Sequence, residues 1–203
     1  MAHEHEYDPS KLTNPTLRGA AMGLDVAEKI AEIGIAHESH LAELATKDEL
    51  TGIDNRRGFN EAMAAAQAVH KRRGAIYTVV GIDLDGLKPI NDKQGHSAGD
   101  DALKTMASAL QSRARKEDTV ARLGGDEFAM LLTQATAEQA SHILGEIRES
   151  LQESSKLTFS GGIAQVGDDE TVQAAFNRAD EAQTLAKQRK DAIEVSSRSE
   201  LLA

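Results

Sequence analysis

The sequence predicts an α+β domain, in which helices pack against one sheet. Residues 75–83 form a β-branched apolar run, which is typical of a buried strand. Residues 118–133 contain two apolar runs around a pair of glycines, which is typical of a β-hairpin. Stretches with helical apolar periodicity separate these strands. Helices interleaved with antiparallel strands are characteristic of this fold class.

The composition limits the classes of function. The 203 residues suffice for one domain and an additional element, and with only 3% aromatic residues the core should be aliphatic. The absence of cysteine excludes disulfides and thiolate metal sites, and the net charge of -10 disfavours non-specific binding to nucleic acid. The sequence has no long apolar span and no signal-peptide pattern, so we expect a cytoplasmic protein that does not associate with a membrane.

We divide the chain into an N-terminal tail and helical stalk at 1–47, a domain at 48–196 and a C-terminal tail at 197–203. A helix is predicted from about residue 24 to residue 47. Its residues at alternating four- and three-residue steps are Val26, Ile30, Ile33, His37, His40 and Leu44. This spacing matches a short coiled-coil seam that could pair two chains, and a single helix packed on the domain is the alternative.

The elements of the domain are predicted in order along the chain. They are a helix at 59–72, the strand at 75–83, a polar loop at 88–100, a helix around 103–110, the hairpin at 118–133, a helix from the capping-box pair Thr136 and Gln139 to about 151, a strand at 156–164, a helix at 171–189 and a short strand at 193–195. Arg56 and Arg57 are expected to anchor the first turn of the domain by ion pairing, with Asp48 as a partner.

Acidic residues follow the two best-defined strand signals. Asp83 ends an apolar strand, Asp85 lies two residues later on the same face, and Asp126 and Glu127 stand at the hairpin tip. Carboxylates that converge repel one another unless a cation neutralises them, and Mg²⁺ or Mn²⁺ suits such oxygen ligands. The pattern therefore predicts a metal–nucleotide site for phosphoryl transfer. The alternative is a tight Gly-Gly-Asp turn whose acids are solvated.

Four polar residues crowd the loop after Asp83, namely Lys88, Asn91, His96 and Asp100. An asparagine and an aspartate together can read the Watson–Crick edge of a purine, because the carboxylate accepts from guanine N–H groups. A lysine can meet a phosphate as a point charge. The loop thus adds a candidate nucleotide-binding segment to the acidic cluster.

Five ordered motifs together resemble the GGDEF domains, the diguanylate cyclases that join two GTP molecules into cyclic di-GMP and release pyrophosphate. They are "DELTGIDNRRGF", "DLDGLKPINDKQGHSAGD", "RLGGDEF", "LTFSGGIA" and "RADEAQTLAK". The resemblance covers about residues 48–190. It implies a palm-like α+β domain with an antiparallel-rich central sheet, and two domains that face each other in a homodimer, each holding one GTP.

The resemblance also implies roles for single residues. Asp83, the Leu84 carbonyl, Asp126 and Glu127 would bind Mg²⁺, and Asp126 or Glu127 would act as the base for the attacking hydroxyl. For the substrate, the implied contacts are Asn91 and Asp100 to guanine, His96 beside the substrate, Gly124 and Gly125 at the triphosphate, and Lys88 and Lys187 to phosphates. Arg115 and Asp118 match the spacing of the RxxD product-inhibition site, and a surface ion pair is the alternative.

One departure from the family pattern follows Lys187. The family commonly has a Gly-Arg-Asn turn there, whereas this chain has "QRKD", with Asp191 at the arginine position. Arg189 or Lys190 could replace the missing cation. The leading hypothesis is an active diguanylate cyclase, and the alternative is a weak or inactive module that senses GTP or cyclic di-GMP. A scaffold that only dimerises through its stalk is a third possibility.

Overall fold

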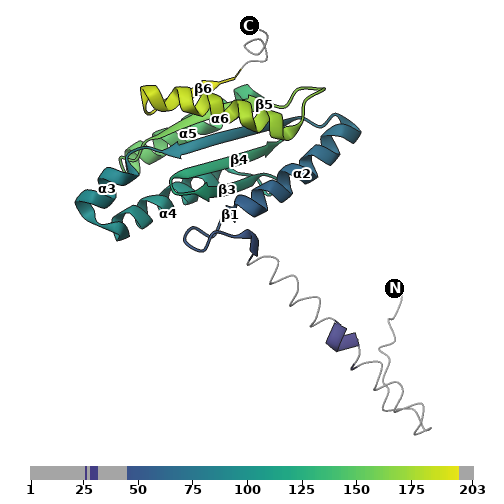
Figure 1. Ribbon diagram of the computed structural model, residues 1–203, viewed down its shortest axis with the longest axis horizontal. Helices are drawn as coiled ribbons and strands as arrows, with labels where there is room; N and C mark the ends of the chain where they lie inside the picture. The colour runs from purple at the N-terminus through teal and green to yellow at the C-terminus, as the bar shows by residue number, and fades with distance from the viewer. Residues whose placement is uncertain (1–25, 27, 32–44, 197–203) are drawn as a thin grey trace, which may run out of the picture. The chain divides into compact units, whose positions relative to one another are not determined.

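The computed structural model describes Val26, residues 28–31 and residues 45–196 (Figure 1). Val26 and residues 28–31 are helical, and the side chains of Val26 and Ile30 are exposed. Ala45 and Thr46 at the end of the predicted stalk are also helical. Residues 32–44 of the stalk and both tails lie outside the described residues, so the coiled-coil seam stays a prediction. The chain divides into a unit ending at Ala45 and a unit that begins at Thr46 and contains the sheet.

The elements of the second unit follow one another with short connections. Their bounds are β1 Asp54–Asn55, α2 Arg56–Arg73, β2 Tyr77–Leu84, α3 Leu87–Gln94, α4 His96–Arg113, β3 Thr119–Gly124, β4 Glu127–Thr133, α5 Ala137–Ser154, β5 Phe159–Gln165, α6 Val172–Arg189 and β6 Ile193–Val195.

The described strands form one sheet in the order β1-β3-β4-β2-β5-β6. The central strand β2 runs antiparallel to both β4 and β5, and β3 runs antiparallel to β4. Only the two edge pairs, β1 with β3 and β5 with β6, are parallel. The prediction of an α+β domain with an antiparallel-rich sheet is therefore confirmed.

Helices cover both faces of this sheet (Figure 1). On one face, Ile82 and Met130 of the sheet pack with apolar residues of α4 and α5, among them Met106, Leu110, Leu144 and Ile147. On the other face, Val79 and Leu131 pack with residues of α2 and α6, among them Phe59, Met63, Ala175 and Ala179.

Because side chains alternate along β2, Asp83 points to the same face as Val79, toward α6.

Two glycines let α6 approach the sheet closely. A Cβ atom added to Gly162 of β5 would lie 2.8 Å from Gln183 Cα of α6 and closer still to Ala179 O. Its cross-strand neighbour Gly81 faces the same helix at 3.7 Å from Ala179 O. The small buried residues of α6 complete the contact. This close approach brings the C-terminal end of α6, with Lys187, over the end of β2.

The prediction of a polar loop at 88–100 was wrong, because this segment is helical in α3 and at the start of α4. Two glycines with positive φ, Gly86 at 76° and Gly95 at 88°, stand before the two helices. The helix α3 has no buried residue, so it lacks the apolar stripe by which a helix is recognised in a sequence. Its polar face is nevertheless compatible with a helix that packs beside α4 (Figure 1).

The helix predicted around 103–110 is found, but α4 begins seven residues earlier, at His96. The other predicted elements are confirmed within about three residues, including the Thr136 capping box, in which Thr136 Oγ accepts from the Gln139 N–H. The predicted ion pair of Asp48 with Arg56 or Arg57 was wrong. Asp48 pairs instead with Arg122 of β3 at 3.3 Å. The strand β1 was not predicted, since two residues carry no periodicity.

Candidate nucleotide and metal site

The hairpin tip between β3 and β4 is bent by its glycines. Gly124 has a φ of 149° and Gly125 a φ of 54°, values that side chains disfavour, and a bulge interrupts the pairing between Arg122 and Gly124. The Leu84 N–H donates to the Asp126 carbonyl at 3.0 Å. The tip is thereby tied to the end of β2, and Asp126 lies beside Asp83.

A hollow of about 360 Å³ opens at this point. Its lining includes seven residues that the sequence singled out, namely Asp83, Leu84, Asp85, Lys88, Asp126, Lys187 and Lys190. They come from the end of β2, the hairpin tip, α3 and the C-terminal end of α6. The structure thus brings together three carboxylates and three lysines from four segments of the chain.

Asp83 is almost fully buried, and its Oδ2 accepts from Lys187 Nζ at 2.6 Å. Burial raises the pKa of Asp83 above its ordinary value, the hydrogen bond from Lys187 opposes this rise, and the negative charge of Asp126 adds to it. The same hydrogen bond raises the pKa of Lys187, with contributions from the charges of Asp126 and Glu127. The hydrogen bond from Lys187 thus favours the ionised form of Asp83, whereas burial and the charge of Asp126 oppose it.

Glu127 stands directly opposite Asp83 in the register of β2 and β4. Its side chain is 56% exposed, and Glu127 Oε2 lies 3.5 Å from an amino group of Arg56. Glu127 does not line the hollow that contains Asp83 and Asp126; it lines a neighbouring one with Arg56. Its side chain is thus held on the α2 side of the tip.

The donors of the hollow fit a hard divalent cation. Mg²⁺ is typically held by one or two carboxylates and completes its shell with water and substrate phosphates, which matches the pair Asp83 and Asp126 with the Leu84 carbonyl. Burial, and to a lesser extent the charge of Asp126, raises the pKa of Asp83, and a bound cation would stabilise the two carboxylates in their ionised form. Within the described residues, no three acidic or histidine side chains cluster closely enough to form a complete protein cage.

The candidate base-reading residues lie on the α3 and α4 pair. Asn91 belongs to α3, whereas His96 and Asp100 are exposed near the start of α4. The Asn91 side chain packs against Gly99, where a Cβ atom would collide with its amide. Asn91 Oδ1 is buried and has no hydrogen-bond partner in the described structure. A polar group in that state is suited to a ligand that supplies a donor.

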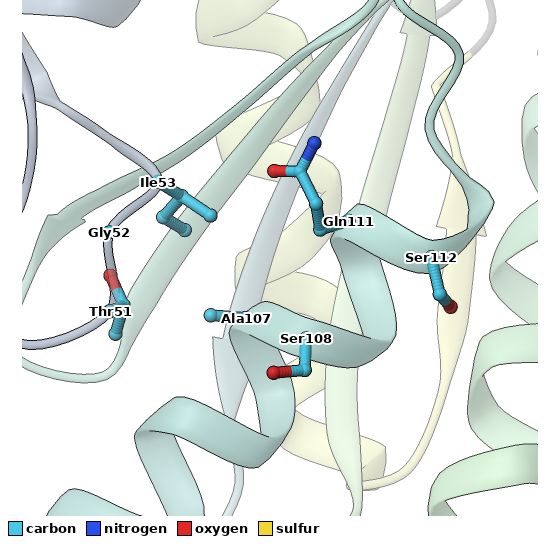
Figure 2. A pocket seen from close by; sticks show the side chains of 7 residues that line it. All are labelled: Thr51, Gly52, Ile53, Ala107, Ser108, Gln111 and Ser112. Atoms are coloured by element: carbon cyan, nitrogen blue, oxygen red, sulfur yellow. The ribbon is translucent and has the colours of Figure 1, made fainter.

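A second hollow, of about 540 Å³, lies between the first turn of the domain and α4 (Figure 2). The described residues that line it are uncharged, among them Thr51, Ser108 and Gln111. It offers neither carboxylates for a metal nor cations for phosphate, so the chemistry points to the hollow at Asp83.

Sequence comparison decides the family. Residues 45–192 match the family described as "Diguanylate cyclase, GGDEF domain". The chain belongs to the GGDEF domain family. It is 35% identical over 173 residues to diguanylate cyclase DgcP of Pseudomonas aeruginosa, and the match covers 79% of this chain and 26% of that protein. It is 37% identical over 155 residues to diguanylate cyclase DgcM of Escherichia coli, with 74% and 38% covered.

The fold agrees with solved GGDEF structures. The coiled coil and GGDEF domain of DgcB from Caulobacter crescentus, crystallised in complex with c-di-GMP, matches with a TM-score of 0.78 and 26% identity, covering 87% of this chain and 100% of that one. The chain spans only about a quarter to two fifths of the length of DgcP and DgcM. No helix among the described residues is long and apolar enough to cross a membrane.

The RxxD pair of this GGDEF domain lies at the opposite end of the β3–β4 hairpin from the glycine tip. Both oxygens of Asp118 accept from backbone N–H groups, those of Arg115 and Thr133, each at 2.8 Å. The alternative of an ion pair between Arg115 and Asp118 is not seen, and no hydrogen bond or ion pair holds the Arg115 side chain in the part of the chain that the structure describes. Asp118 therefore stabilises the open end of the hairpin, and it is also a candidate residue for binding the product.

Two residues, Arg122 and Asp85, support the site through hydrogen bonds that the sequence does not predict. Arg122 donates to the Gly125 carbonyl at 3.0 and 2.9 Å and thereby holds the tip against Asp48. Asp85, grouped with the acidic residues by its position, lines the hollow and accepts from the Ser160 hydroxyl and from the Asp191 N–H. The role of Arg122 could have been suspected from the sequence, because it is a charged residue within an otherwise apolar strand.

Proposed function

We propose that this GGDEF domain is a diguanylate cyclase, which condenses two GTP molecules into cyclic di-GMP and two pyrophosphates. The observation that carries the proposal is the hollow in which Asp83 and Asp126 meet Lys88 and Lys187. Carboxylates for a metal and cations for phosphates in one place are what phosphoryl transfer requires. The family membership and the names of DgcP and DgcM support the same reaction.

The residues for the metal are Asp83, the Leu84 carbonyl and Asp126, with Glu127 completing the set. Bound Mg²⁺ or Mn²⁺ would neutralise the charge of the phosphates. Lys88 and Lys187 bind phosphate oxygens, and Gly124 and Gly125 leave room for them at the hairpin tip. Asp126 and Glu127 jointly orient and deprotonate the attacking 3′-hydroxyl.

Guanine is proposed to bind at the α3–α4 pair. The Asp100 carboxylate accepts from the guanine N1–H and N2–H groups, the buried Asn91 amide accepts and donates beside it, and His96 lies next to the substrate. The unpartnered Asn91 Oδ1 supports this assignment, since a base that donates to it would satisfy a buried acceptor.

The reaction requires two such domains that face each other, since each 3′-hydroxyl must meet the α-phosphate of the other GTP. We propose a cytoplasmic homodimer paired by residues 1–47, and the coiled coil in the DgcB crystal structure supports a pairing segment in this position. A pairing segment raises the effective concentration of the second half-site. The C-terminal tail at 197–203 has no proposed role.

Incubation of the protein with GTP and Mg²⁺, followed by nucleotide chromatography, tests the activity. We expect cyclic di-GMP to form, with a specific rate that rises with protein concentration until the dimer is saturated. Asp126→Asn should abolish turnover, and Asp169→Asn, at an exposed acid after β5 that does not line the hollow, is the matched control. Tight binding of cyclic di-GMP without any turnover would instead establish the sensor alternative.

Product inhibition at the RxxD pair is tested with Arg115→Ala. The exposed Arg115 side chain can be removed without cost to the fold, so the variant should lose inhibition by added cyclic di-GMP at unchanged initial rate. Asp118→Ala is the poorer probe, because it also leaves two backbone N–H groups without their acceptor. Inhibition of Arg115→Ala equal to that of the parent protein would refute the assignment.

A further inference from the structure

We propose that Lys190 is a phosphate-binding residue of the nucleotide hollow, and that the left-handed turn at Lys190 and Asp191 holds it there. The inference rests on the proposed function, because GTP is the ligand whose phosphates Lys190 would meet. It concerns the position at which this chain departs from the family pattern, and it assigns the cation that compensates for Asp191.

The charges around the hollow favour an anion at Lys190. Lys88, Lys187 and Lys190 all line it. Lys187 is neutralised by Asp83 at 2.6 Å, but in the described part of the chain no carboxylate lies within ion-pair distance of Lys88 or Lys190. Asp83, Asp85 and Asp126 also line the hollow, but within the described residues neither Lys88 nor Lys190 pairs with one of them. A polyphosphate would supply a partner for both lysines.

The negative charge of Asp191 is directed elsewhere. Asp191 Oδ2 accepts from Gln152 Nε2 of α5 at 2.5 Å, and the Asp191 N–H donates to Asp85 Oδ2 at 3.1 Å. The Asp191 carbonyl accepts from Arg148 Nη1 of α5 at 3.4 Å. Asp191 does not line the hollow. The Asp191 side chain thus faces α5, whereas Lys190 lines the hollow where phosphate is proposed to bind.

The backbone at this turn is unfavourable for the residues that occupy it. Lys190 has a φ of 56° with a ψ of 149°, and Asp191 has a φ of 45°. Glycine adopts such angles freely, whereas a lysine is strained there. A strained lysine that lines a charged hollow, where glycine would be more stable, indicates that the side chain is used. The anchoring of Asp191 to α5 and Asp85 is what maintains the strained turn.

The neighbouring cation serves as a matched control. Arg189 carries the same charge and is also exposed, but its Nη1 pairs with Glu194 Oε1 of β6 at 2.6 Å. Arg189 does not line the hollow. Of the two candidates for the replacement cation, the geometry therefore assigns Lys190.

Calorimetric titration compares Lys190→Gln with Arg189→Gln. The ligands are GMP and the GTP analogue with a methylene bridge between its α- and β-phosphates, which cannot release pyrophosphate. We expect Lys190→Gln to bind the analogue about tenfold more weakly, as for one lost charged contact, and GMP unchanged. Arg189→Gln should bind both like the parent protein.

A parental affinity in Lys190→Gln, or an equal loss for GMP, would overturn the assignment and leave the proposed function intact. If the parent protein fails to bind the analogue at all, the proposed function fails and the inference falls with it. Lys190→Gly separates binding from folding. It should raise the midpoint of urea unfolding because the strain is relieved, and yet bind the analogue as weakly as Lys190→Gln. Parental affinity of Lys190→Gly would also overturn the proposal.

Discussion

Gly162→Ala tests whether the close approach of α6 to the sheet positions the site. The added Cβ would lie 2.8 Å from Gln183 Cα and nearer still to Ala179 O. Carbon atoms in favourable contact are about 3.5–4.0 Å apart, and Ala179 O would lie nearer than Gln183 Cα, so α6 would have to retreat from β5 by at least about 1 Å. Overpacking of this kind costs about 1–3 kcal/mol, and the clash with backbone atoms, which cannot change rotamer, places the expected loss at the upper end.

Equilibrium unfolding in urea measures this loss, and Gly161→Ala is the control. Gly161 is the neighbouring residue of β5, but it faces the opposite side of the sheet, where a Cβ would meet Leu144 Cδ1 at 3.4 Å in ordinary contact. The control should change the unfolding free energy by less than about 1 kcal/mol. If the two variants unfold at the same urea concentration, the close packing of α6 on Gly162 is refuted.

The same displacement should reach the site. Lys187 lies on α6 and contacts Asp83 at 2.6 Å, so a retreat of about 1 Å weakens their ion pair and moves a cation of the phosphate site. We therefore expect Gly162→Ala to lower the rate of cyclic di-GMP formation at temperatures where the variant remains folded. Gly161→Ala should retain the parental rate.

Three further predictions concern stability in urea. Gly145→Ala should stabilise the protein by about 1 kcal/mol, because Gly145 lies within α5 and a Cβ there meets nothing within 4 Å. Arg178→Met should cost about 3–5 kcal/mol, because it leaves the buried Glu170 carboxylate without the guanidinium that lies 2.8 Å away. Asp48→Asn should cost about 1–3 kcal/mol at neutral pH. Burial would raise the Asp48 pKa, but hydrogen bonds and the charge of Arg122 lower it below 3.8, so this stability is present above that pH and is lost as the pH falls through the folded-state pKa. Equal destabilisation by Asp48→Asn in strong acid and at neutral pH would contradict this interpretation.

The sequence predicts those parts of the fold in which an apolar period is visible. The strand β2, the hairpin and the helices α2, α4, α5 and α6 each carry buried residues at a regular spacing, and these were predicted. The helix α3 was taken for a loop because it buries no residue. Its helical form depends on Gly86, whose positive φ turns the chain, and on packing against α4, neither of which a periodicity can reveal.

The meeting of the acidic residues in the candidate site could be predicted from the sequence, but the contacts that hold them in place could not. Asp83 and Asp126 could be expected to meet, because a strand end and a hairpin tip adjoin in an antiparallel sheet. The contact of Lys187 with Asp83 was not expected, since it depends on how closely α6 approaches Gly162. The partners of Asp85, Ser160 and the Asp191 N–H, could not be predicted either, because they come from segments distant in sequence.

The charged groups of the hollow change the stability of the folded protein. Burial raises the pKa of Asp83, so the folded state holds this proton more tightly than the unfolded chain, and ionised Asp83 destabilises the fold as the pH rises above its ordinary value. Lys187 acts in the opposite direction. Its raised pKa means that its charged form stabilises the folded state below its ordinary value of 10.5, a contribution lost only as the pH rises through the folded-state pKa. The hydrogen bond from Lys187 therefore opposes the effect of burial on Asp83. Lys187 favours the ionised form of Asp83, which is the form that binds a cation, and it lies beside the place where phosphate is proposed to bind.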